Sequence, residues 1–117
     1  MTEVIDELVE NALRELADEA YQRRLWLASG GSEVSSFTEC VSRLWDDSGL
    51  SEALDQPHSV YTPEIDDHLR ELRAFLGRID DSRSPEAILK DPRLESVRAM
   101  AYALLQDLRR FGSDYSS

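Results

Sequence analysis

The side chains best suited to acid–base or metal chemistry lie around His68. Glu64 stands four residues before it and Glu71 three after it, so both are its neighbours if the segment is helical. Carboxylates beside an imidazole can form an acid–base pair or hold a metal ion. The di-iron signature of helical bundles needs a Glu three residues before the His, where this chain has Ile65, and no second helix repeats the pattern. We therefore expect a histidine at the core boundary, hydrogen-bonded to Glu64 or Glu71, and no metal site.

Other residue types that could carry catalysis lack the partners they need. Cys40 is the only cysteine, and its nearest charged neighbour, Glu39, opposes formation of a thiolate. The serines lack the Gly-x-Ser-x-Gly context of a nucleophile. His58 has no second ligand nearby in the sequence, and the Gly-Gly-Ser at 30–32 is better explained as a loop with a helix cap than as an anion cradle. We expect no catalytic residue and no cofactor, with Cys40 a small core residue.

Pairs of consecutive aspartates are the densest acidic features, at Asp46 and Asp47, Asp66 and Asp67, and Asp80 and Asp81. A calcium loop needs oxygen ligands at a fixed spacing, a glycine bend and a closing glutamate, and none of these segments has that pattern. The first and third pairs lie near the C-termini of predicted helices, where the dipole disfavours an anion by a few tenths to about 1 kcal/mol. Two interpretations remain open: solvated turn residues that end helices, or an acidic patch facing a partner.

Four segments carry apolar residues at every third or fourth position, which is typical of amphipathic helices. The predicted helices cover residues 4–28, 33–47, 63–79 and 92–111, with a cap at Ser32 for the second. Glycines at 30–31, 49 and 112 mark helix ends. Thr62-Pro63, Ser84-Pro85 and Asp91-Pro92 each combine a capping side chain with a proline at the first helical position, where its missing N–H costs nothing.

The helical pattern also predicts the fold class. No segment alternates apolar and polar residues long enough for a sheet, and only residues 59–61 look extended. We expect an all-α protein: an antiparallel four-helix bundle with short extra helical turns in the second and third connections. Residues 1–112 would form a single domain, followed by a flexible C-terminal tail at 113–117.

The second half of the first predicted helix carries charge where its apolar stripe should continue. Glu19 and Arg23 would then project toward the core, where an ion pair is costly if dry. Trp26 and Trp45 could close one end of the core or anchor a protein interface. We expect this end to be a contact surface, and we predict these partner-binding residues: Glu19, Arg23, Trp26, Trp45, Asp46, Asp47, Asp80 and Asp81.

Charge and composition restrict the partners. The 117 residues include 24 Asp and Glu against 13 Lys and Arg, which gives a net charge of −11. Such a surface disfavours nucleic acid and anionic membranes, and it speeds association with a basic protein. A simple solubilising role for the charge is the alternative. The sequence has no long apolar run, its first residues are acidic, and it has one cysteine, so we expect a cytoplasmic protein.

No motif identifies a reaction or a ligand, so these features indicate only a class of function. We expect a non-enzymatic protein that binds another protein, in the sharpest version a bacterial inhibitor, immunity or antitoxin-like factor that masks a basic partner. One alternative is a homo-oligomeric structural or accessory subunit, with the Trp-bearing end or the Tyr102 side of the fourth helix as the self-contact. Another is a helical bundle that binds a small molecule between its helices.

Overall fold

The computed structural model describes residues 4–27 and 36–116, and within these ranges it contains helices and no strand. In chain order the helices are α1 (Asp6–Ala17), α2 (Glu19–Trp26), α3 (Phe37–Ser42), the π-helix η1 (Arg43–Asp47), α4 (Leu50–Leu54), α5 (Pro63–Leu76), α6 (Pro85–Leu89) and α7 (Pro92–Ser116). The prediction of an all-α protein is confirmed. No helix in the described ranges is long and apolar enough to cross a membrane.

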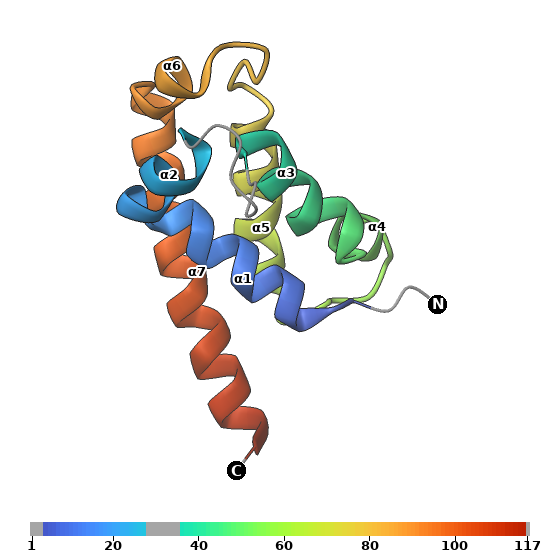
Figure 1. The fold of residues 1–117 in the computed structure, drawn as a ribbon. Helices are drawn as coiled ribbons and strands as arrows, with labels where there is room; N and C mark the ends of the chain where they lie inside the picture. The colour runs from blue at the N-terminus through green and yellow to red at the C-terminus, as the bar shows by residue number, and fades with distance from the viewer. Residues whose placement is uncertain (1–3, 28–35, 117) are drawn as a thin grey trace.

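The long helix α7 organises the core. It packs against α1 and α5, while α3, η1 and α4 continue from the other side of α1 (Figure 1). The apolar stripe of α5 is buried except for the half-buried Phe75. The stripe of α7 is buried as far as Leu108, and Phe111, about one turn further on, is half-buried. Beyond this packing, the C-terminal part of α7 projects from the body of the molecule (Figure 1).

The three predicted helix starts are confirmed by their capping bonds. Thr62 Oγ1 accepts a hydrogen bond from the Ile65 N–H at 3.0 Å, and Ser84 Oγ accepts one from the Ala87 N–H at 3.3 Å. Asp91 Oδ1 accepts the Arg93 N–H at 2.8 Å. Each such cap stabilises its helix by about 1 kcal/mol because it gives a partner to an N–H that the helix itself leaves unpaired.

The prediction of one helix over 4–28 is wrong, because the chain breaks at Asp18. Asp18 has an extended backbone (φ −113°, ψ 101°), and its side chain caps α2 by accepting the Tyr21 N–H at 3.1 Å. The break leaves carbonyls at the end of α1, and Gln22 Nε2 donates to two of them, Glu15 O and Leu16 O, both at 2.8 Å. The turn therefore presents Gln22 to the core, and Glu19 and Arg23 stay exposed.

The second predicted helix is only partly confirmed. The described part begins at α3, which Ser36 caps by accepting the Glu39 N–H at 3.1 Å. The predicted cap Ser32 and the glycines at 30–31 lie outside the described residues. From Arg43 the helix widens into η1, and Gly49 ends it with a left-handed φ of 80°, as the sequence predicted.

Two helix ends differ from the predicted ones. Helix α5 ends at Leu76 rather than at Ile79, although Ile79 is still buried. Helix α7 continues to Ser116, so it includes residues 113–116, which the sequence assigned to a tail. Apolar periodicity sets the buried positions correctly, but it marks a helix end less sharply than a capping bond does.

Candidate functional site

The structure places both tryptophans in the core. Trp26 is 4% and Trp45 6% exposed, so neither ring is available on the surface as an interface anchor. Trp26 packs edge-on against Phe37, with ring centroids 5.9 Å apart. Of the two interpretations that the sequence left open, the structure therefore supports the one in which both tryptophans are core residues.

A buried carboxylate, Glu15, holds Trp26 in place. Its Oε2 accepts the Trp26 Nε1–H at 2.8 Å, and its Oε1 lies 3.1 Å from Arg43 Nη2 in an ion pair between α1 and η1. Cys40 packs beside this group, with its Sγ 3.5 Å from Ala12 O. Burial, and then the nearby Glu15 carboxylate, raise the pKa of the Cys40 thiol well above its ordinary value. Cys40 is thus a neutral core residue, and Glu15 is a buried group that sequence reasoning missed.

Next to Glu15, a chain of polar contacts joins α2 to α7. Arg98 Nε donates to Gln22 Oε1 at 2.9 Å, and Arg98 Nη1 lies 3.7 Å from Glu19 Oε1. Glu19 Oε2 also accepts from Arg23 Nε at 2.9 Å. The hydrogen bond from Arg23, followed by the charge of Arg98, holds the pKa of Glu19 below its ordinary value. Glu19 and Arg23 therefore pair as the sequence predicted, on the surface rather than in the core.

A polar hollow of about 370 Å³ opens beside these contacts, lined by Asn11, Arg14, Glu15, Asp18, Tyr21 and Arg43. Both signs of charge line it, and the Glu15 carboxylate is already engaged by two donors. The contacts around this hollow therefore tie α1, α2 and η1 together.

Asp46 and Asp47 are exposed on η1. The Ile5 N–H donates to Ser48 O at 2.9 Å, which joins the start of α1 to the end of η1. The exposed Asp6 and Glu7 of α1 consequently lie on the same corner as the η1 pair. We call these four carboxylates the acidic corner.

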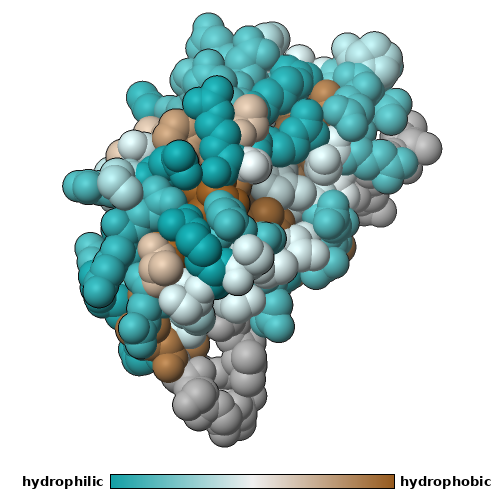
Figure 2. Space-filling model, turned by 90° about the horizontal axis from the view of Figure 1, so that it is seen from above, coloured by the Kyte–Doolittle hydropathy of each residue, from teal (hydrophilic) through white to brown (hydrophobic). Residues whose placement is uncertain are grey.

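Asp80 and Asp81 are exposed in the connection between α5 and α6. Asp80 Oδ1 accepts from the Ser82 N–H at 3.0 Å and from Ser82 Oγ at 2.6 Å, and these hydrogen bonds lower the pKa of Asp80. This connection and η1 lie at different ends of the molecule (Figure 1), so the two aspartate pairs cannot form one patch. Figure 2 views the α6 end and shows hydrophobic residues there only in small areas between hydrophilic ones.

In the remaining aspartate pair, Asp66 and Asp67, the first residue has a structural role. Asp66 is 1% exposed and accepts two backbone hydrogen bonds, from the Val60 N–H at 2.7 Å and from the Tyr61 N–H at 3.0 Å. These bonds fix the bend at Val60 and Tyr61 against the first turn of α5. Its neighbour Asp67 is exposed and pairs with Arg70 at 3.0 Å.

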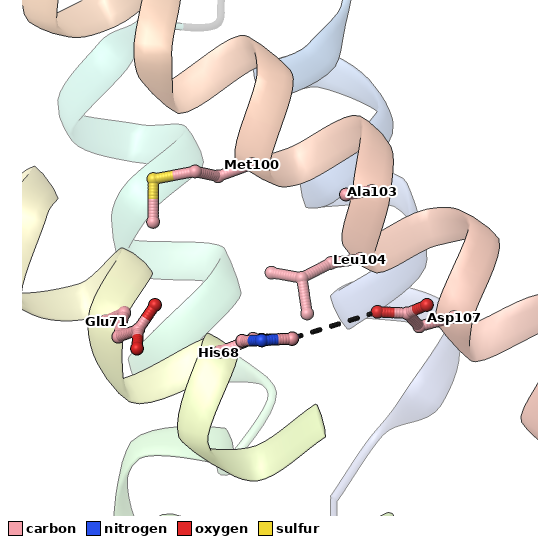
Figure 3. Close-up of a pocket in the computed structure, with 6 residues that line it drawn as sticks. All are labelled: His68, Glu71, Met100, Ala103, Leu104 and Asp107. Carbon is pink, nitrogen blue, oxygen red and sulfur yellow. Dashed lines mark ion pairs between the residues drawn. The ribbon is translucent and has the colours of Figure 1, made fainter. Parts of the chain in front are cut away.

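His68 has a different partner from the one that the sequence predicted. Its Nδ1 lies 3.9 Å from Asp107 Oδ2 on α7, so the imidazole reaches across to the neighbouring helix instead of bonding Glu64 or Glu71 along its own. A groove of about 220 Å³ lies here between the two helices, lined by His68, Glu71, Met100, Ala103, Leu104 and Asp107. Figure 3 shows these side chains facing one another from α5 and α7.

The described part of the chain contains no group of three His, Cys, Asp or Glu side chains arranged to hold a metal ion. The groove and the acidic corner both present carboxylates, and the groove alone also has the apolar lining residues Met100, Ala103 and Leu104. No known protein family, curated protein or solved structure matches this chain.

Proposed function

We propose that this chain is a non-enzymatic cytoplasmic protein that binds and masks a basic protein partner, in the manner of an inhibitor, immunity protein or antitoxin. The observation that carries the proposal is how the chain distributes its charges. Arginines are bound within the chain at both ends of the molecule and on α5, through Arg43 to Glu15, Arg83 to Asp91 and Arg73 to Asp55.

Other arginines, such as Arg24, Arg78 and Arg109, are exposed, but exposed carboxylates outnumber exposed cations among the described residues. Exposed acids on several elements include Glu7, Asp46, Asp47, Glu52, Glu64, Glu71, Asp81, Glu86 and Glu95. With a net charge of −11, this surface repels polyphosphates and anionic lipids and accelerates encounter with a cationic protein. We interpret the scaffold that displays it as an antiparallel four-helix bundle built from α1, α3 with η1, α5 and α7.

A homo-oligomeric accessory subunit is the second candidate function. The observation that favours it is Tyr102, whose side chain on α7 is 61% exposed. A large exposed aromatic residue is a common component of protein interfaces. The two candidates differ in what the chain binds, a basic protein or itself.

Affinity capture of the tagged chain from its native lysate, at low and at high salt with mass identification of bound chains, tests the first candidate. We expect one basic protein that is bound at low salt and lost at high salt. Asp47→Asn removes one exposed negative charge and should weaken the capture. Lys90→Gln removes one exposed positive charge and is the matched control, which should not weaken it. Recovery of only the chain itself at both salts would contradict masking and support self-association, which light scattering would then measure.

A further inference from the structure

The outward face of α7 contains an uncharged stretch at residues 99–106, in a chain of which 32% of residues are charged. Ala99, Tyr102 and Ala103 are exposed in this stretch, and Met100 is half-buried. Small residues at 99 and 103 lie one helical turn apart, which leaves room for another backbone to approach. This part of α7 therefore presents small and apolar side chains without charge.

The uncharged face leads directly into the groove between α5 and α7. Met100, Ala103 and Leu104 form its apolar part, and Glu71 and Asp107 supply carboxylates on its two sides (Figure 3). Past the contact of His68 with Asp107, a second hollow of about 310 Å³ continues along the same seam, lined by Thr62, Glu64, Ile65, His68, Asp107, Arg110 and Phe111. The two hollows together follow α7 from Met100 to Phe111, a length of about 16 Å or three helical turns.

The dimensions of this seam decide between kinds of occupant. Pockets for small molecules usually enclose about 300–1,000 Å³ and bury most of the ligand, whereas the first hollow has about 220 Å³ and the second, with about 310 Å³, is at the lower limit. Each hollow has room for a side chain, and the pair is spaced along a helix axis. That arrangement matches a helix laid into a groove, which inserts side chains at i, i+3 or i+4, and i+7.

The charges along the seam indicate whether its occupant is positively or negatively charged. Glu64 and Glu71 border it as exposed carboxylates, whereas Asp107 is already paired with Arg110 at 2.6 Å. A second copy of this chain docked on the same face would bring these carboxylates against their own counterparts. A cationic segment would instead meet them with opposite charge.

We propose that the seam between α5 and α7 binds a basic amphipathic helix of the partner protein. Apolar side chains of that helix lie on Met100, Ala103 and Leu104, and its lysines or arginines lie against Glu64 and Glu71. This inference rests on the proposed function and adds where the partner binds and which part of it is recognised.

The test is a titration of the isotope-labelled chain with a synthetic peptide of leucine and lysine patterned as an amphipathic helix, followed by NMR amide shifts. A peptide of the same composition with its period scrambled controls for charge alone. Ala103→Arg places bulk and positive charge in the groove. Ala20→Arg makes the same change at an exposed position of α2 and serves as the matched control.

We expect the shifts to concentrate at residues 64–71 and 100–111, with binding weakened about tenfold or more in Ala103→Arg and little changed in Ala20→Arg. Equal binding of the scrambled peptide, equal effects of the two variants, or absence of peptide binding would overturn the groove assignment. Concentration-dependent shifts at the same residues without peptide would assign the seam to a second copy instead. The proposed function is tested separately. If the Ala103→Arg variant still captures a basic protein from lysate, the proposed function is upheld and the groove assignment is wrong.

Discussion

Replacement of Glu15 by alanine is the sharpest test of the buried polar contacts that hold α1, α2 and η1 together. The Glu15 carboxylate is 4% exposed and accepts from both Trp26 Nε1 and Arg43 Nη2. Removing it leaves a buried indole N–H without this acceptor and separates a cation from its counter-charge. The change therefore acts on three helices at once.

The expected loss follows from the exposure of the two donors. A buried donor deprived of its acceptor costs about 1–3 kcal/mol. The Arg43 side chain is 36% exposed, so water compensates part of its loss, and that contribution stays below about 1 kcal/mol. We expect Glu15→Ala to lower the free energy of unfolding by about 3 kcal/mol, which corresponds to a fall in Tm of about 10 °C for a domain of this size.

Urea unfolding followed by tryptophan fluorescence measures this loss directly. Glu19→Ala is the matched control, because it removes one carboxylate from the same corner but from an exposed pair, and we expect a clearly smaller loss of stability because water screens an exposed pair. Glu15→Gln keeps an acceptor for Trp26 and should fall between the two variants. If Glu15→Ala is as stable as Glu19→Ala or more stable, the buried carboxylate does not hold these helices together as described.

Three further predictions concern single residues. Cys40 is fully buried with a raised pKa, so a disulfide reagent should modify it only in denaturant, and rapid modification of the native chain would contradict its placement. Gly49 has a φ of 80°, so Gly49→Ala should lower the free energy of unfolding by about 1–2 kcal/mol, measured by urea titration; no loss would contradict the left-handed turn. The hydrogen bond from Arg83 lowers the pKa of Asp91, so its stabilisation is present above about pH 4 and is lost as the pH falls through the folded-state pKa. Thermal unfolding across this range should show a smaller acid loss for Asp91→Asn, and identical pH profiles would count against the pair.

The sequence predicts those parts of the fold that depend on local chemistry. A capping side chain followed by proline is a property of consecutive residues, and the starts of α5, α6 and α7 were therefore predictable. The apolar stripes of α5 and α7 follow from periodicity alone. The break at Asp18 was not predictable in this way, because it depends on Gln22 reaching back to carbonyls of α1 and on Arg98 from a distant helix.

The candidate sites show the same division. The ion pair of Glu19 with Arg23 follows from their spacing on one helix. His68 was identified from its residue type, but its partner Asp107 lies on another helix, and no spacing in the sequence relates the two. The uncharged stretch at 99–106 was visible in the sequence; its importance depends on the groove that α5 forms beside it.

Native mass spectrometry of the tagged chain, purified from its own cells at low salt, tests whether the chain acts by binding a basic protein. We expect a complex of this chain with a second, basic chain, and we expect the complex to separate as the salt concentration is raised. A spectrum containing only this chain, alone or as a homo-oligomer, would contradict the proposed function.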